Sequence, residues 1–140
     1  MPTVLDSPFY RVTAKALIFQ DSKLLLVRSI KDHWEIPGGG WEHDETFETC
    51  LAREIQEELG VRIQTVGPVL LMYKGASHRH GFKTLRITAS VELASHEFML
   101  GDDMQEYRFV DKDEFLRLDM MHAEGSVQEY VDQIWSQVEK

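Results

Sequence analysis

The chain has 140 residues, of which 43% are hydrophobic, and its formal net charge of −9 comes from 15 Lys and Arg against 24 Asp and Glu. This size and apolar content predict one folded domain that covers residues 1–140, and they argue against intrinsic disorder. The negative charge argues against bulk binding to nucleic acid or to an anionic membrane. A polyphosphate ligand would therefore depend on local cations, which bound metal ions can supply.

Cysteine content and the first residues bear on location. Cys50 is the only cysteine, so no intrachain disulfide can form, and a reducing compartment is favoured. The sequence begins without a basic region followed by an apolar run, and it has no stretch that is long and apolar enough to cross a bilayer. We therefore expect a cytoplasmic protein without a signal peptide or a membrane span.

The first regular elements are predicted to be two strands joined as a hairpin. Residues 10–19 alternate apolar and polar side chains, and residues 23–28 form a nearly continuous aliphatic run, which is typical of a central strand. Residues 20–22 (Gln-Asp-Ser) lie between them and predict a tight turn. Arg28 ends the second strand near a glycine-rich segment, so it is a candidate phosphate contact. A surface arginine without a binding role is the alternative.

The glycine-rich segment consists of Pro37 followed by Gly38, Gly39 and Gly40. This composition predicts an irregular loop rather than a helix or a strand. Glycine allows the backbone to approach a metal ion or a phosphate closely, whereas a plain turn is the alternative. The segment leads directly into an acidic helix, which favours a role in a site. No Gly-Lys-Ser or Gly-Lys-Thr follows, so the segment is not a Walker loop.

The acidic helix is predicted to run from about Thr46 to the residue before Gly60. Asp44 or Thr46 can cap the first amides, and Gly60 suits the left-handed conformation that often ends a helix. The apolar side chains recur every four residues and span a sector of about 120°. They are Phe47, Leu51, Ile55 and Leu59.

Three glutamates of this helix point in an unusual direction. At roughly 100° per residue, Glu58 falls inside the apolar sector and Glu54 lies at its edge. By the same estimate, Glu57 lies about 60° beyond Glu54 around the helix axis. Like charges at this spacing destabilise a helix, and their partial burial costs far more unless a cation compensates. Clustered carboxylates suit a hard divalent ion such as Mg²⁺. The alternative is a helix that tolerates three glutamates near a partner's lysines.

The stretch from Gly39 to Val61 resembles a known family motif. It matches the Nudix box, G-x5-E-x7-R-E-U-x-E-E-x-G-U, in which U is a bulky aliphatic residue. All nine defined positions are filled, by Gly39, Glu45, Arg53, Glu54, Ile55, Glu57, Glu58, Gly60 and Val61. The chain is therefore similar to the Nudix hydrolases of the MutT type.

The resemblance implies a reaction and a set of site residues. The reaction is the hydrolysis of a nucleoside diphosphate linked to another group, with Mg²⁺ or Mn²⁺. The implied metal ligands are Glu54, Glu57, Glu58 and the backbone carbonyl of Gly38. Arg53 would orient Glu54, so that the implied catalytic residues are Glu54, Arg53 and Glu57.

Further roles carried by the resemblance concern the glycine segment and the downstream half. Glu45 would hold this segment and the helix together, and Gly39 and Gly40 would contact substrate. In some family members the residue that matches Glu54 deprotonates the attacking water, whereas others use an acid from downstream. Glu106 occupies such a downstream position, so it is a second candidate base, metal ligand or substrate contact, with a structural role as the alternative.

The second half of the chain is predicted to be mainly β. Residues 61–65 and 69–73 predict two strands interrupted by Gly67-Pro68, and 84–93 and 106–110 predict two more. The polar loop between the second and third of these strands contains His78, Arg79 and His80. It is an exposed hairpin loop or a substrate-contacting loop, with Arg79 as the candidate contact. A zinc site is the weakest alternative, because the ligand spacing is absent.

Two helices are predicted near the C-terminus. Residues 111–118 suit a short helix capped by Asp111, and Ser126 with Glu129 forms a capping box for a final helix. The final helix carries an apolar stripe that packs on the sheet or, as the alternative, forms a dimer interface. The stripe comprises Val127, Tyr130, Val131, Ile134, Trp135 and Val138.

Together these features predict an α+β protein, and the resemblance narrows this to the Nudix fold, in which a mixed β-sheet is sandwiched between α-helices. The predicted function is metal-dependent hydrolysis of a pyrophosphate bond in a small nucleotide or other diphosphate, with nucleoside triphosphates as one option. The alternatives are a nucleotide-sensing domain with weak or no turnover and an interaction domain with an incidental acidic helix. Either a monomer or a homodimer is compatible with the sequence.

Overall fold

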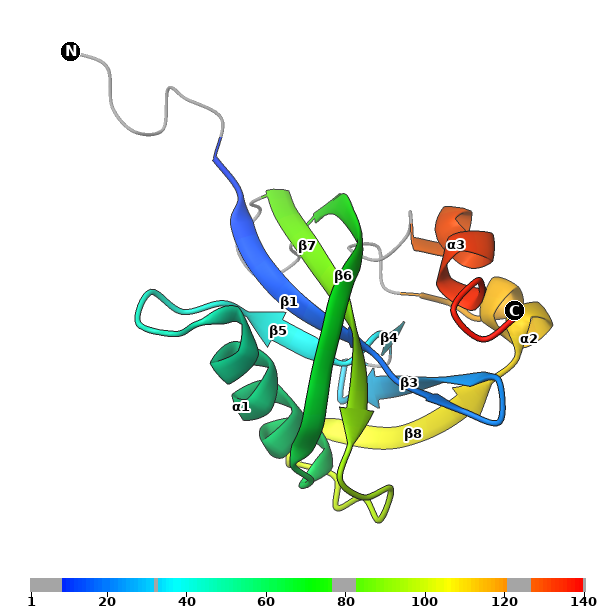
Figure 1. Cartoon of the computed structure of the whole chain (residues 1–140), viewed down its shortest axis with the longest axis horizontal. Coiled ribbons are helices and arrows are strands. Elements are labelled where there is room, and N and C mark those ends of the chain that lie inside the picture. Colours follow the sequence, from blue (N-terminus) through cyan, green and yellow to red (C-terminus); the bar gives the residue numbers. More distant parts are fainter. Residues whose placement is uncertain (1–8, 32, 77–82, 121–126, 140) are drawn as a thin grey trace.

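The computed structural model describes residues 9–31, 33–76, 83–120 and 127–139, which fold into strands flanked by helices (Figure 1). The strands are β1 (Arg11–Leu17), β2 (Phe19–Gln20), β3 (Lys23–Ser29), β4 (Trp34–Glu35), β5 (Gly38–Gly40), β6 (Ile63–Ala76), β7 (Lys83–Leu93) and β8 (Met104–Val110). The helices are α1 (Phe47–Leu59), α2 (Lys112–Arg117), the 3₁₀ helix η3 (Val127–Tyr130) and α3 (Val131–Trp135).

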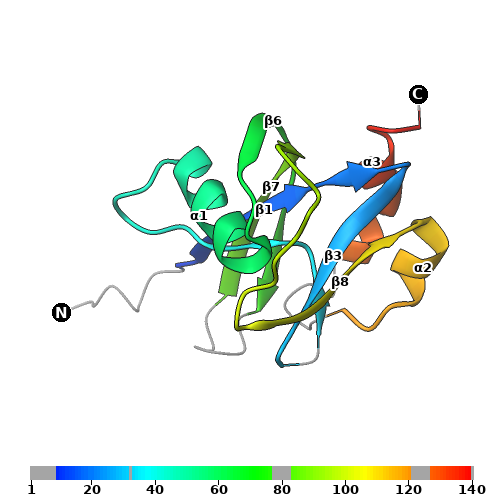
Figure 2. The same cartoon turned by 90° about the horizontal axis from the view of Figure 1, so that it is seen from below.

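The strands form two four-stranded sheets. Sheet A has the order β5-β1-β7-β6, in which β1 runs parallel to β7 and the other two pairs are antiparallel. Sheet B has the order β2-β3-β4, and β8 also pairs with β3 in antiparallel fashion. Figure 2 shows α1 on one side of the strands and α2 with α3 on the other. The predicted α+β class, with a mixed sheet between helices, is confirmed, although the strands divide into two sheets.

Two apolar clusters hold these layers together. One cluster lies under α1 and contains Ala14, Ala16, Ile18, Leu25, Val27, Cys50, Leu51, Ile55, Leu59, Val61, Val91 and Leu93. The other joins both sheets to α2, η3 and α3, and it contains Leu17, Leu24, Leu26, Trp34, Ile36, Leu71, Tyr73, Val110, Phe115, Met120, Val127, Ile134 and Trp135. The predicted packing of the last helix on β structure is confirmed by this second cluster.

The ends of α1 agree closely with the sequence prediction. Thr46, rather than Asp44, is the N-cap, because its side chain accepts a hydrogen bond from the amide of Thr49. The Thr49 side chain accepts a hydrogen bond from the Thr46 amide, which completes a capping box. At the other end Gly60 has a φ of 68°, in the left-handed region that glycine adopts without strain.

The predicted hairpin between residues 10–19 and 23–28 is also present. Asp21 and Ser22 both have positive φ angles, of 52° and 63°, as the two central residues of a tight hairpin turn require. β3 is central in sheet B, as its aliphatic run predicted. The first predicted strand is divided at Ile18, so that β1 belongs to sheet A and β2 to sheet B.

The prediction that Gly38–Gly40 could not form a strand is wrong. These residues are β5, the edge strand of sheet A, which pairs with β1 through Lys15↔Gly38, Ala14↔Gly39 and Thr13↔Gly40. The physical reason is close packing of the two backbones. Gly38 has a φ of 137°, and a Cβ atom there would overlap the carbonyl oxygen of Ala14. Glycine is therefore required for this strand to dock.

Other boundaries differ in the second half of the chain. The two strands predicted around Gly67-Pro68 are one strand, β6, which absorbs the interruption through shifts of register against β7. The predicted loop at 74–83 is shorter, because β6 extends to Ala76 and β7 begins at Lys83. His78, Arg79 and His80 lie outside the described residues.

The last predicted helix is shorter than its apolar stripe. It consists of η3 followed by α3, which ends at Trp135, while Val138 packs against the second apolar cluster without belonging to a helix. Ser126, the first residue of the predicted capping box, lies outside the described residues. The predicted short helix is present as α2, and the Asp111 side chain accepts a hydrogen bond from the amide of Glu114 at its start. Among the described residues, no helix has the length and hydropathy needed to span a membrane.

Candidate active site

Arg53 on α1 is the centre of a network that joins three parts of the chain. Its guanidinium donates to both carboxylate oxygens of Glu45, with N···O distances of 2.6 and 2.9 Å, and to Oε1 of Glu54 at 2.8 Å. It also donates to the backbone carbonyl of Gly40 at 3.0 Å. These bonds lower the pKa of Glu45 to about 2, chiefly because Arg53 stabilises its charged form. Arg53 thus ties α1 to β5 and to the loop between them.

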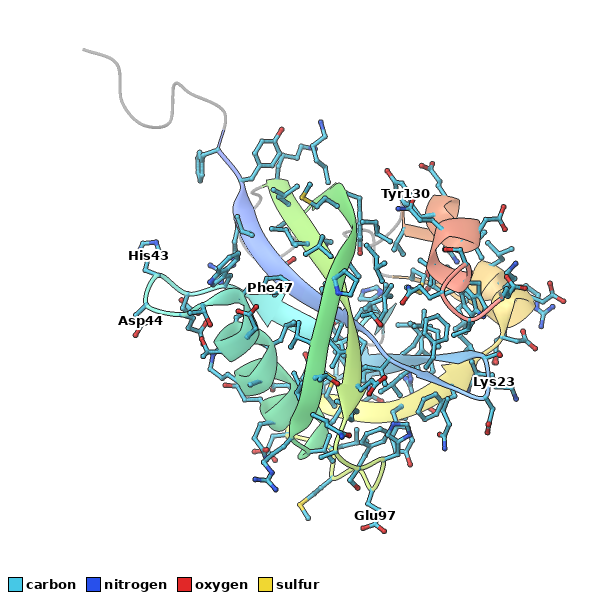
Figure 3. All side chains as sticks on the ribbon, in the orientation of Figure 1. Lys23, His43, Asp44, Phe47, Glu97 and Tyr130 are labelled. Carbon is cyan, nitrogen blue, oxygen red and sulfur yellow. The ribbon has the colours of Figure 1, made fainter. Side chains whose placement is uncertain are left out.

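The same loop has a tip that lies apart from this network. Figure 3 shows His43 and Asp44 at the end of the β5–α1 loop, pointing away from the helix. At the base of the loop the Trp41 ring packs edge-on against Phe47, with ring centroids 5.6 Å apart, and its Nε1 donates to the Glu45 carbonyl at 2.7 Å. The aromatic pair therefore fixes the backbone of Glu45, which in turn binds Arg53.

Glu54 faces the glycine strand directly. Its side chain is 14% exposed, and a Cβ atom at Gly39 would lie 2.5 Å from its carboxylate. The missing side chain of Gly39 therefore provides the space that the Glu54 carboxylate occupies. Burial raises the pKa of Glu54, and this effect is opposed by the hydrogen bond and charge of Arg53.

Glu58 is more deeply buried, with 7% of its surface exposed. Its Oε1 accepts a hydrogen bond from the amide of Gly38 at 3.0 Å. Burial raises the pKa of Glu58 well above its ordinary value; the nearby charge of Lys15 lowers it, and the carboxylates of Glu35 and Glu54 raise it. Two glutamates with elevated pKa values thus lie against adjacent residues of β5.

The predicted metal ligands differ in their surroundings. Glu58 is buried and Glu54 is partly buried, whereas the Glu57 side chain is 58% exposed and contacts Arg53 at 3.4 Å. In the part of the chain that the structure describes, no group of three or more His, Cys, Asp or Glu side chains is close enough to hold an ion as it stands. The chemistry of Glu54 and Glu58 nevertheless fits a hard divalent ion, because such an ion prefers carboxylate oxygens. Metal ligation by this set stays a prediction.

The pKa of Glu58 gives a prediction for the metal-free protein. A carboxyl group with a raised folded pKa destabilises the fold when it ionises, so stability rises as pH falls through that pKa toward the ordinary value of 4.5. Glu58→Gln removes this charge and keeps an oxygen that can accept from Gly38. We expect a higher Tm than the parent in EDTA at neutral pH, and a smaller rise on acidification to about pH 5.

Thermal melts in EDTA across this pH range would check the expectation. Glu48→Gln is the matched control, because Glu48 is exposed on the first turn of the same helix. A Glu58→Gln protein that melts below the parent at neutral pH would contradict the proposed cost of this buried charge.

Arg28 and Glu106 are brought together in sheet B. They are cross-strand neighbours on β3 and β8, and Arg28 Nη2 lies 2.7 Å from Oε1 of Glu106. The guanidinium groups of Arg28 and Arg108 lie 5.8 and 4.9 Å from the centre of the Trp34 ring. The substrate-binding role of Arg28 and the role of Glu106 as a base or ligand stay predictions.

Sequence reasoning missed Lys15. It is one of the polar residues in a strand where apolar and polar residues alternate, a pattern that normally predicts a solvent-facing side chain. In the structure both faces of β1 are covered, Lys15 is 3% exposed, and its Nζ donates to the Ile36 carbonyl at 3.0 Å. The local pattern gave no signal for this burial, because alternation alone does not show which faces of a strand are covered.

Comparisons with known proteins agree with the fold and this geometry. The model of the NUDIX domain family matches residues 9–130. An ADP-ribose pyrophosphatase of Methanocaldococcus jannaschii is 29% identical over 86% of this chain and 72% of its own length. A MutT-like protein of Streptomyces ambofaciens is 42% identical over 59 residues, and this match spans 41% of this chain and 38% of the relative.

A solved structure shows the same architecture. The crystal structure of a MutT protein from Methanosarcina mazei superposes with a TM-score of 0.78 at 21% identity, covering 95% of this chain and 98% of that one. Because the family model matches most of the chain, this protein belongs to the Nudix hydrolase family. Hydrolases of this family generally need a divalent metal ion.

Proposed function

We propose that this protein hydrolyses a pyrophosphate bond in a nucleoside diphosphate linked to another group, and that the reaction needs Mg²⁺ or Mn²⁺. The observation that carries the proposal is the position of Glu54 and Glu58. The Glu54 carboxylate lies beside Gly39, and buried Glu58 accepts a hydrogen bond from the Gly38 amide on the strand that pairs with β1. Arg53 and Lys15 offset part of their charge, and the carboxylate oxygens that remain suit a metal-complexed polyphosphate.

Each residue of the site has a proposed role. Glu54, Glu57, Glu58 and the Gly38 carbonyl would hold the metal. A bound divalent ion supplies polarisation of phosphoryl oxygens and a lower pKa for its bound water. Arg53 holds the Glu54 carboxylate in one orientation through the 2.8 Å hydrogen bond, so that Glu54 can accept a proton from the attacking water. The backbone of Gly39 and Gly40 lets phosphate groups approach.

One relative, matched over 86% of this chain, is named an ADP-ribose pyrophosphatase, which makes ADP-ribose the first compound to test. Nucleoside triphosphates are the second. A nucleotide-sensing domain without turnover remains the alternative function, and a complete Arg53 network argues against it, because binding alone does not require an oriented base.

The test is a substrate panel with product identification by chromatography, in Mg²⁺, in Mn²⁺ and in excess EDTA. We expect turnover of at least one compound with either metal and none in EDTA. We also expect Mg²⁺ to raise the Tm, because an ion that binds only the folded state stabilises it. Full turnover in EDTA would exclude the metal requirement. Nucleotide binding without turnover of any compound would favour the sensing alternative.

A further inference from the structure

The segment between β7 and β8, residues 94–103, packs against the last turn of α1 (Figure 1). We call it the connecting segment. The amide of Met99 donates to the carbonyl of Leu59, with an N···O distance of 2.9 Å. The amide of Gly101 donates to the carbonyl of Glu58 at 3.1 Å. The last carbonyls of a helix have no partner within the helix and carry the negative end of its dipole, so the connecting segment supplies two of the donors that they need.

Gly101 lies closer to this helix than a residue with a side chain could. A Cβ atom at this position would overlap the carbonyl oxygen of Glu57 and lie 3.8 Å from the Cα atom of Glu58. The φ angle of Gly101 is not in the left-handed region, so glycine is needed here for space rather than for its backbone conformation. The absence of a side chain therefore lets the connecting segment touch the backbone of these two glutamates.

The connecting segment is also held from its other side, so it cannot easily move away from the helix. Leu100 packs against the apolar cluster under α1. The carbonyl of Gly101 accepts from the amide of Met104 at 3.1 Å. The carbonyl of Asp103 accepts from the amide of Ile30 at 2.9 Å. A group added at Gly101 would therefore displace the last turn of α1 as well as the segment itself.

The last turn of α1 carries two of the three candidate glutamate ligands. The carboxylate of Glu58 accepts from the amide of Gly38 at 3.0 Å, and that of Glu57 lies 3.4 Å from Arg53. Glu54, one turn earlier, is held by its own 2.8 Å hydrogen bond from Arg53. Of the three glutamates, Glu57 and Glu58 are thus the two whose backbone the connecting segment touches.

We propose that Gly101 is a positioning residue for the metal site, because its contact with the backbone of Glu57 and Glu58 sets where their carboxylates lie relative to β5. This assignment rests on the proposed function, in which both glutamates are metal ligands. Residues that support metal ligands from behind typically change metal affinity by about 10-fold to 100-fold when they are replaced. A residue more than a strand away in sequence thereby tunes the affinity for the ion, while Arg53 keeps the orientation of Glu54.

Gly101→Ala tests this role, with Mn²⁺ as the probe and the electron paramagnetic resonance signal of the free ion as the readout. We expect the variant to bind Mn²⁺ about tenfold more weakly than the parent in the absence of substrate, because Glu57 and Glu58 are displaced from β5. The Mg²⁺ concentration for half-maximal turnover should rise by a similar factor. The kcat at saturating Mg²⁺ should change much less, because Glu54 and Arg53 stay in place.

Gly67→Ala is the matched control. Gly67 on β6 also approaches another backbone closely, since a Cβ atom there would lie 3.2 Å from the carbonyl oxygen of Ser90 on β7. Whatever its Tm, this variant should bind Mn²⁺ like the parent. Parental Mn²⁺ binding by a folded Gly101→Ala protein, or equal weakening in the two variants, would overturn the assignment and leave the proposed hydrolysis intact. A parent protein that binds no Mn²⁺ would instead refute the proposed metal site, and with it this role for Gly101.

Amide hydrogen exchange in the parent protein needs no variant, so it decides the proposal if Gly101→Ala does not fold. Coupling between two sites is reciprocal, so an ion held by the last turn of α1 should stabilise the contacts that position this turn. We expect saturating Mg²⁺ to slow exchange at the amides of Met99 and Gly101 more than at the amide of Ala94. Ala94 is the internal reference, because it donates to the carbonyl of Arg62 at the start of the same segment. Equal slowing at all three amides would mean that the segment supports the fold alone.

Discussion

Replacing Glu54 with Gln should lower kcat by roughly 10²–10⁴, the usual contribution of a positioned acid–base group, while the protein remains folded. Gln keeps the size and helix propensity of Glu, and its amide can still accept from Arg53, which donates to Oε1 of Glu54 at 2.8 Å. What it lacks is the negative charge and the basic oxygen. Steady-state kinetics with Mg²⁺ on the best substrate of the panel would measure the loss.

Two further measurements make this prediction decisive. The Tm of Glu54→Gln in EDTA should equal or exceed that of the parent, because burial of one charge near Glu58 is removed. Glu48→Gln, the same substitution on the exposed face of α1, should leave kcat unchanged. A Glu54→Gln enzyme with parental turnover would refute the proposed role of Glu54 as base or ligand.

Arg53→Ala is expected to reduce kcat by at least roughly 10²-fold, as misplacement of a catalytic group by about 1 Å does. The substitution leaves Glu45 and Glu54 without their shared cation and frees the Gly40 carbonyl, so β5 and α1 lose one of their ties. We also expect a lower Tm. The apolar side of α1 is untouched, so the variant should remain folded.

The pH dependence of the Arg53→Ala protein gives an independent check. Arg53 is the main cause of the pKa of about 2 at Glu45, so a proton should bind Glu45 at higher pH in the variant. The parent loses the stabilisation from this ion pair as pH falls from about 4.5 toward 2, and the variant has none to lose. Arg62→Ala, at an exposed position after α1, is the control. Equal kcat values for Arg53→Ala and the parent would exclude the orienting role.

The acidic helix was predictable because its signals are local. Its caps, its apolar spacing and the inward direction of Glu54 and Glu58 all follow from residues within a few turns. The glycine strand was not predictable, because glycine is a poor strand former. It is held in sheet A by the fit of Gly38 against Ala14, a residue 24 positions earlier.

The burial of Lys15 and the continuity of β6 have the same origin. Alternation shows that Lys15 and Ala14 point in opposite directions, but only the arrangement of the sheets shows that both sides of β1 are covered. Likewise, the Gly67-Pro68 interruption ends a strand on local grounds, whereas long pairing with β7 carries β6 through it. Contacts between distant segments decide these features, and a single sequence does not display them.

The parallel pairing of β1 with β7 has a consequence for folding. Arg11 pairs with Thr84, so the loop closed by this contact contains the glycine strand and the whole of α1. Closing so long a loop is entropically slow, and parallel pairs between distant segments are typical of slow-folding topologies. During synthesis α1 emerges well before β7, the strand that pairs with β1 and contributes Val91 and Leu93 to the cluster under α1. We infer that the apolar side of α1 is only partly covered until β7 is made, because β1 and β3 supply the rest of the cluster under it, and that refolding monitored by activity lags behind the formation of helix.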